Sequence, residues 1–326
     1  MSSTASSPSR SRGILVLIVA LALPLALVAG AIIWWNGGIG PLVGREQCTI
    51  EGPNTTIELD ADQVAYASTI AAVAQRSELP KRAVTVGLAT AMQESELRNL
   101  DGGDHDSAGL FQQRPSQGWG DFEQVTDPVY ASEAFFKALI AIEQWQRLPV
   151  TEAAQAVQRS AFPDAYEQHT EGAKTLATAL TGRRGAALSC TVRAEDEAAQ
   201  KLDETGLIPR ATNLRSIMES AWGTQSLGGF APGGVQRANP SAHNEGRAID
   251  VFFEPIRDRQ SRHEGWAMAH WLVANADELD ASVVIYRDKI WSARRSPEGW
   301  RDYVPPFGDP DDPTLRHMDH VHVEVP

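Results

Sequence analysis

The chain has 326 residues, a formal net charge of −13 and a hydrophobic content of 42%. At roughly 100–200 residues per domain, this length predicts two domains joined by shorter segments, each able to bury a core. The acidic balance argues against a nucleic-acid partner, because surfaces that bind nucleic acid are basic. It also gives no general attraction to acidic polymers, so recognition of such a polymer would require a shaped groove.

The N-terminal segment has the pattern of a single-pass membrane anchor. Residues 14–35 contain no charged side chain and are long enough to cross a bilayer as a helix. Arg10 and Arg12 lie in the preceding residues 1–13, which favours a cytoplasmic tail. The alternative is a cleaved signal peptide with its A-x-A site at Ala29-Gly30-Ala31. Under either interpretation, the rest of the chain lies outside the cytoplasm.

Linker-like and helical patterns alternate after this anchor. Residues 36–58 contain several Gly and Pro turn signals and predict a linker. Residues 59–181 predict an all-α domain, with a first helix that starts near Asp60 and a second that follows Pro80. Residues 182–205 are polar and acidic and predict a second linker.

Residues 206–326 predict an α+β domain with a small antiparallel sheet. The final segment alternates polar and apolar side chains, which is typical of a half-buried strand. The expected strands are 248–253, 283–286 and 320–325, and the expected helix is 264–276. The predicted fold is therefore an N-terminal transmembrane helix, an all-α domain and an α+β domain.

The two cysteines flank the predicted all-α domain. Cys48 precedes it and Cys190 follows it. In an oxidising compartment they would close a loop of about 140 residues, which contributes a few kcal/mol in the chain-entropy model. The alternative is two free thiols.

The C-terminal domain carries residues suited to a metal site. His243 stands seven residues before Asp250, and the chain ends with His317-Met-Asp319-His320-Val-His322 and four further residues. Residues two apart on a strand share a face, so the last two histidines point the same way. Imidazole and carboxylate groups are common zinc ligands, and a catalytic site keeps one position open for water. Paired histidines also occur on solvated strand faces, but the upstream His/Asp pair favours a metal.

The pattern S-x-H-x-x-G-x-A-x-D with a late H-x-H resembles the zinc peptidase superfamily of D-Ala-D-Ala carboxypeptidases, murein endopeptidases and the Hedgehog-type fold. The resemblance covers residues 206–326. It implies zinc ligands at His243, Asp250 and His322. It also implies a catalytic or oxyanion-stabilising role for His320, a substrate-binding role for Ser241, and a general base at Asp319 or His317. Zinc would lower the pKa of its bound water toward about 7.

In the predicted all-α domain, Glu94 lies near a helix end and is followed by Gly109-Leu110-Phe111-Gln112. This resembles the lysozyme-like lytic transglycosylases, over residues 59–181. The resemblance implies Glu94 as the catalytic acid, with Ser107, Gln112 and Gln158 in the substrate groove. A partly desolvated carboxyl can deliver its proton to a glycosidic oxygen, and closure of an anhydro ring by the sugar removes the need for a second carboxylate. The family's Tyr-Asn pair has its counterpart at Val157-Gln158, which lacks the aromatic hydroxyl.

Together, these patterns predict a membrane-anchored, extracytoplasmic peptidoglycan hydrolase that needs zinc. One alternative is a catalytically inactive protein that binds peptidoglycan, or serves as a scaffold, in wall remodelling or secretion. Another is a peptidase whose substrate lies outside the wall. No motif specifies a protein partner.

Overall fold

A β-hairpin is the first element after residue 45, where the sequence predicted a linker. The computed structural model describes residues 46–194 and 198–326. β1 (Gln47–Glu51) and β2 (Thr56–Asp60) pair antiparallel, and the N–H of Gly52 donates to the carbonyl of Thr55 across the turn, at 2.7 Å. β3 (Leu188–Thr191) pairs with the other edge of β1, which gives a three-stranded sheet of order β2-β1-β3.

This sheet shows that the predicted all-α character of the first domain was wrong. Cys48 of β1 and Cys190 of β3 face each other in the strand register and form a disulfide, so the predicted bond is confirmed. Some of the Gly and Pro residues that suggested a linker, Gly52 and Pro53, form the turn of the hairpin. The predicted membrane anchor at 14–35 lies outside the described residues. Among the residues that are described, no helix is long and apolar enough to cross a membrane.

Residues 46–191 form what we call the helical part, built around two long helices. α2 (Ala61–Arg76) begins at Asp60, which forms a capping box with Gln63, and α3 (Lys81–Ser95) follows Pro80. Both starts agree with the sequence prediction. The other helical elements are η1 (Pro115–Gln117), α4 (Phe122–Val125), α5 (Pro128–Ile140), α6 (Val150–Gln158), η2 (Glu167–His169) and α7 (Thr170–Leu180).

Residues 198–326 form what we call the sheet part. Its sheet is antiparallel, with the strand order β4-β5-β9-β6-β7-β8. The elements are α8 (Pro209–Trp222), β4 (Leu227–Gly228), η3 (Ala242–Glu245), β5 (Ala248–Phe252), α9 (Arg259–Ala274), β6 (Val283–Tyr286), β7 (Lys289–Ser292), η4 (Ala293–Glu298), β8 (Arg301–Asp302) and β9 (His320–Glu324). The predicted antiparallel sheet is thus confirmed.

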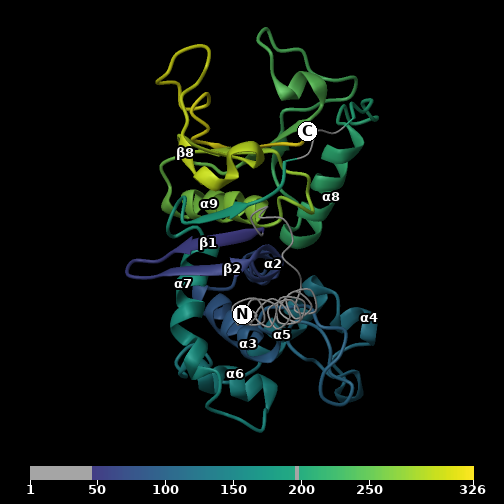
Figure 1. Ribbon diagram of the computed structural model, residues 1–326, viewed down its shortest axis with the longest axis vertical. Coiled ribbons are helices and arrows are strands. Elements are labelled where there is room, and N and C mark those ends of the chain that lie inside the picture. Colours follow the sequence, from purple (N-terminus) through teal and green to yellow (C-terminus); the bar gives the residue numbers. More distant parts are fainter. Residues whose placement is uncertain (1–45, 195–197) are drawn as a thin grey trace, which may run out of the picture. The chain divides into compact units, whose positions relative to one another are not determined.

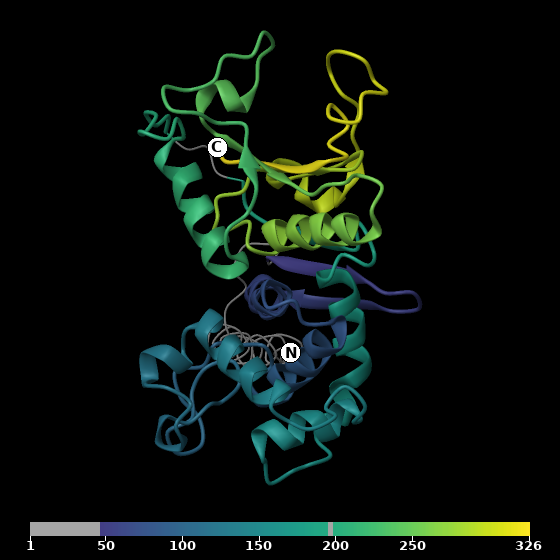
Figure 2. The same ribbon diagram turned by 180° about the vertical axis from the view of Figure 1, so that it is seen from behind.

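The faces of this sheet differ in what covers them. α9 packs against β6 and β9 on one face (Figure 1). The segments 229–247 and 303–319 rise from the opposite side, as Figure 2 also shows from behind. Along β9, Val321 and Val323 are fully buried and alternate with His320, His322 and Glu324. Strand alternation therefore directs the two histidines and the glutamate away from α9.

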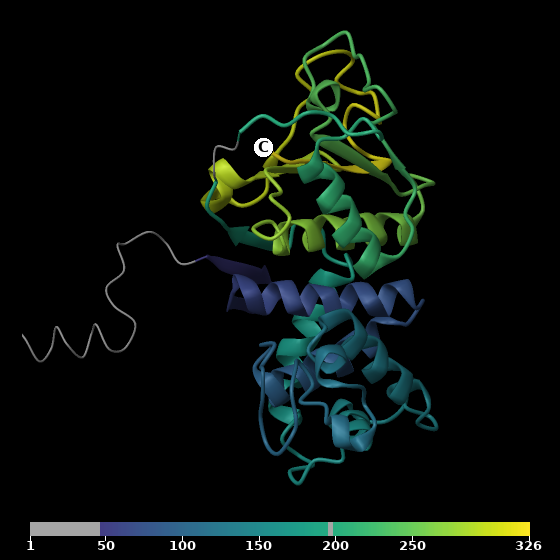
Figure 3. The same ribbon diagram turned by 90° about the vertical axis from the view of Figure 1, so that its right-hand side faces the viewer.

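α2 packs against both parts of the described chain. It contacts α3 and α5 of the helical part and α8 and α9 of the sheet part (Figure 3). The amide of Asn275, just after α9, donates to the hydroxyl of Ser68 on α2, at 2.9 Å. Both side chains are buried. Residues 46–326 consequently form one compact unit.

Candidate functional site

His243 is held by a short helical turn before β5. η3 begins after Ser241, whose hydroxyl accepts the N–H of His243, at 3.3 Å. The turn ends at Gly246, which has a positive φ of 67°. Ser241, predicted to bind substrate, thus serves at least to shape the turn that presents His243.

The pairing of β5 with β9 brings the other two predicted ligands together. Asp250 lies directly opposite His322 in the antiparallel register. The Oδ1 atom of Asp250 is 2.9 Å from Nδ1 of His322 and 3.2 Å from Nε2 of His243. The ligand atoms of the three residues all lie within 4.8 Å of one another. The sequence-predicted triad is therefore assembled, and it could hold a metal ion.

The surroundings of the triad fit a bound cation. The side chains of all three residues are at most 7% exposed, so their polar atoms are shielded from water. Gly229 lies close beside them, since a Cβ there would come within 2.4 Å of Nδ1 of His243 and 3.0 Å of Oδ2 of Asp250. Two imidazoles and one carboxylate are a donor set that zinc accepts.

The electrostatics of the triad also favour a positive charge between the ligands. Burial opposes the charge of Asp250, but hydrogen bonds with His243 and His322 hold its pKa well below the usual range. Burial likewise opposes protonation of His322, yet its hydrogen bonds with Asp250 and Glu324 raise its pKa to about 9. Without a metal, this buried carboxylate is balanced by a proton. A divalent cation would replace that proton.

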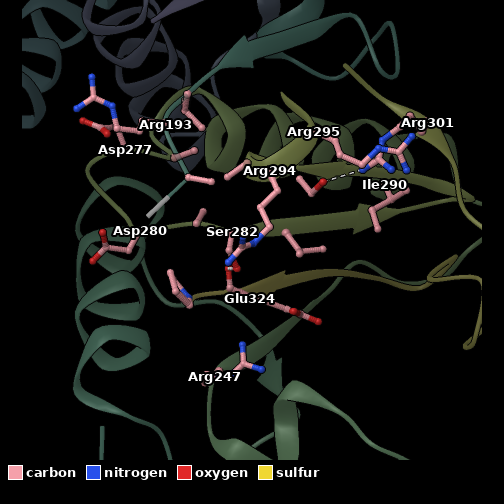
Figure 4. Close-up of a pocket in the computed structure, with 18 residues that line it drawn as sticks. Arg193, Arg247, Asp277, Asp280, Ser282, Ile290, Arg294, Arg295, Arg301 and Glu324 are labelled. Atoms are coloured by element: carbon pink, nitrogen blue, oxygen red, sulfur yellow. Dashed lines mark hydrogen bonds between the residues drawn. The ribbon is translucent and has the colours of Figure 1, made fainter. Parts of the chain in front are cut away.

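Glu324 is a partner of the triad that the sequence did not single out. Its Oε1 lies 3.0 Å from Nε2 of His322, so one histidine bridges two carboxylates. Such a carboxylate fixes the tautomer and orientation of a ligating imidazole. Glu324 also lines a neighbouring cavity of about 650 Å³ (Figure 4). Arginines in that wall are ion-paired, Arg247 with Glu245 and Arg295 with Glu298.

His320, Asp319 and His317 surround the triad in different ways. Nδ1 of His320 lies 2.7 Å from Oδ1 of Asp319, and its Nε2 lies 3.6 Å from Oδ1 of Asp250. Asp319 thus orients His320 toward the triad. The ring of His317 is tilted against that of His320 and lies edge-on to that of His322, and its buried Nδ1 has no hydrogen-bond partner. Burial and the neighbouring His322 and His320 lower the pKa of His317 to about 2, so it is uncharged.

Arg237 lies beside the triad and was missed by sequence reasoning. Its guanidinium is 3.5 Å from Oδ2 of Asp250, and its side chain is half exposed. Its backbone N–H and carbonyl are both hydrogen-bonded to the side chain of Asn244. No motif marks an arginine at this spacing, so only the folded loop reveals the contact.

A separate groove of about 1090 Å³ in the helical part contains the predicted acid Glu94. The hydroxyl of Tyr166 donates to Oε1 of Glu94, at 2.6 Å. Burial and the adjacent Glu94 raise the pKa of Tyr166, which keeps this hydroxyl protonated. The sequence suggested that an aromatic hydroxyl was lacking at Val157-Gln158. Tyr166 supplies one from the segment after α6.

Ser107, Gln112 and Gln158, predicted to bind substrate, all line this groove. The hydroxyl of Ser107 donates to Oε1 of Gln112, at 3.0 Å, and the amide of Gln112 donates to the carbonyl of Gly109. The amide of Gln158 donates to the carbonyl of Phe111, at 2.7 Å. These hydrogen bonds shape the wall of the groove.

The family described as VldE, C-terminal domain, matches residues 203–318. This stretch includes His243 and Asp250 and stops short of His320 and His322. It covers less than half of the chain. No curated protein matches the chain. The resemblances to zinc peptidases and to lytic transglycosylases therefore stay predictions.

Proposed function

We propose that this chain is an extracytoplasmic peptidoglycan hydrolase that cuts peptide stems at a zinc centre of His243, Asp250 and His322. The observation that carries the proposal is the convergence of three buried donor atoms, with Glu324 behind one of them. A zinc ion bound there would act as a Lewis acid on the scissile carbonyl and on a water molecule. The disulfide Cys48–Cys190 supports a location outside the cytoplasm, because such bonds persist in oxidising compartments.

The remaining steps fall to side chains beside the triad. His320, oriented by Asp319, would accept a proton at Nε2 from the attacking water and deliver it to the leaving amine. The Arg237 guanidinium would stabilise the negative charge that develops on the carbonyl oxygen during attack. The peptidase would be of the D,D-carboxypeptidase or endopeptidase type.

The pair of Glu94 and Tyr166 supports a second activity, or a glycan-binding role, in the helical part. Glu94 lines a groove, and its Oε1 accepts a hydrogen bond from Tyr166, so its carboxyl group would be oriented to deliver a proton to a glycosidic oxygen. The same tethered protein would then act on both bond types of one polymer.

Defined substrates test these assignments separately. The full chain, loaded with zinc, would be incubated with synthetic stem peptides and with glycan strands free of peptide. We expect peptide cleavage that disappears in His322→Ala and persists in Glu94→Gln. Anhydro-sugar products should show the opposite dependence. Peptide cleavage that survives in His322→Ala would refute the metal centre. Zinc binding without cleavage of any stem peptide would favour the binding or scaffold alternative.

A further inference from the structure

Phe162 is an unusual residue in the wall of the Glu94 groove. It is 74% exposed, the highest value for any large hydrophobic side chain in the described part of the chain. A single exposed hydrophobic residue is common on protein surfaces and needs no special explanation. Here, however, the exposed ring belongs to the lining of the same groove that Glu94 lines.

The backbone around Phe162 is held in place. Its N–H donates to the hydroxyl of Ser160, at 3.2 Å, and its carbonyl accepts the N–H of Ala165, at 3.1 Å. The side-chain amide of Gln155 donates to the backbone carbonyl of Ser160, and the hydroxyl of Thr151 donates to the backbone carbonyl of Pro163. The ring is therefore presented by a fixed loop, which reduces the entropy lost when a ligand binds it.

Trp119 contributes a second aromatic ring to the same groove. It lies between Gly118 and Gly120, both with positive φ, in the segment between η1 and α4. It is half-buried and packs against the core, so its position is also fixed. Figures 1 and 2 show the segment before α4 and the segment after α6 at the same end of the helical part.

Polar groups accompany these rings. The amide nitrogen of Gln158 donates to the backbone carbonyl of Phe111, which leaves Oε1 of Gln158 as an acceptor for a ligand. Arg159 and Gln117 also line the groove. A pyranose ring has an apolar face of C–H groups and an edge of hydroxyls. Aromatic faces with adjacent amide and guanidinium groups match both features of a sugar.

We propose that Phe162 and Trp119 are the sugar-stacking residues of the Glu94 groove and set its affinity for glycan strands. This inference rests on the proposed glycan role of the groove. It adds the residues that bind the polymer, and it holds whether Glu94 cleaves the strand or the groove only retains it.

The test measures binding of a β-1,4-linked N-acetylglucosamine hexamer, and of peptide-free glycan strands, by titration calorimetry. The full chain would carry Glu94→Gln as background, so that turnover does not consume the ligand. In this background we expect Phe162→Ala to weaken binding about tenfold, the size of one aromatic contact. Phe162→Trp should restore it, and Phe162→Leu should not, because the flat ring makes the contact.

Phe122→Ala is the matched control. Phe122 is also exposed, at 50%, but lies on α4 and does not line the groove. It should leave the affinity unchanged. Equal binding by the parent and Phe162→Ala would overturn the stacking proposal while leaving the glycan role intact. Absence of binding by the parent to either ligand would refute the glycan role, and the stacking proposal with it.

Discussion

His322 links the candidate metal centre to Glu324 of the same strand. One ring nitrogen faces Asp250 and the other faces Glu324. A carboxylate behind a ligating imidazole raises its basicity and fixes its orientation, and loss of such a partner costs about 10–100-fold in metal affinity. The charge of Glu324 should therefore affect the affinity of the site for a metal ion.

We expect Glu324→Gln to weaken zinc binding at least about tenfold without loss of the fold. Competition with a chromophoric chelator measures the affinity, and circular dichroism checks the fold. Glu298→Gln, which removes an exposed partner of Arg295, is the control and should bind zinc like the parent. Unchanged affinity in Glu324→Gln would mean that this carboxylate does not act on the metal.

His270 makes the stability of the protein depend on pH. It is fully buried, with Nδ1 bonded to the carbonyl of Ala179 and Nε2 accepting the N–H of Ala187. Both bonds are satisfied by the neutral ring only. Burial lowers its pKa to about 4, from the ordinary 6.5. The unfolded chain therefore binds the proton more readily between pH 6.5 and pH 4.

The contribution of neutral His270 is present above pH 6.5 and is lost as the pH falls toward 4. A shift of this size corresponds to about 3 kcal/mol of unfolding free energy. Urea denaturation at pH 7 and pH 4.5 measures the change. His270→Gln, whose amide can donate to Ala179 and accept from Ala187, should show a smaller loss than the parent. An identical pH dependence would show that His270 is not the group responsible.

At the level of elements, the candidate metal centre depends on a close approach of the chain after β4. Gly229 has a φ of +84° and leaves no room for a Cβ beside His243. Gly233 has a φ of +81°, but a Cβ there would meet nothing within 4 Å. The two glycines thus share the same left-handed backbone conformation and differ only in the atoms that surround them.

Gly229→Ala should lower zinc affinity by about tenfold or more, because the added methyl group displaces the ring of His243. Gly233→Ala should bind zinc normally. Both should lose about 1–2 kcal/mol of folding free energy from the left-handed backbone. Chemical denaturation and chelator competition separate the two effects. A Gly229→Ala protein with full zinc affinity would contradict the assigned position of His243.

Local signals in the sequence identified helices α2, α3 and α9 and the strands β5 and β9, which carry Asp250 and His322. The cap at Asp60, Pro80 before α3 and the alternation of β9 each act within a few residues. The three-stranded sheet was not predicted because β1 and β2 are short and β3 pairs with β1 across a sequence separation of 142 residues. A turn of the Gly52-Pro53-Asn54 type looks the same in a linker and in a hairpin.

Site residues were likewise predictable only where a local sequence pattern marks them. The triad was predictable because its spacing is a motif. Tyr166 is 72 residues from Glu94 and lies in no recognisable pattern, so only folding brings its hydroxyl to the carboxylate. Arg237 reaches Asp250 from an irregular loop, where neither periodicity nor capping indicates a direction.

At the level of the whole molecule, α2 joins the two candidate sites into one structure. It packs on α3, whose end carries Glu94, and on α9, which supports the strand that carries His322. The disulfide closes the helical part, and His270 binds the end of α7 to the start of β3. If the proposed function is right, this packing would hold the Glu94 groove and the candidate metal centre in a fixed relation on one polymer.

Mass spectrometry of the products from purified sacculi tests the central claim most directly. The full chain with zinc would be compared with His322→Ala, which removes a ligand, and with Phe122→Ala, which alters an exposed residue away from both sites. The account predicts new peptide ends with the parent and Phe122→Ala and none with His322→Ala. Sacculi left intact by a folded, zinc-loaded parent, or new ends that persist in His322→Ala, would contradict it.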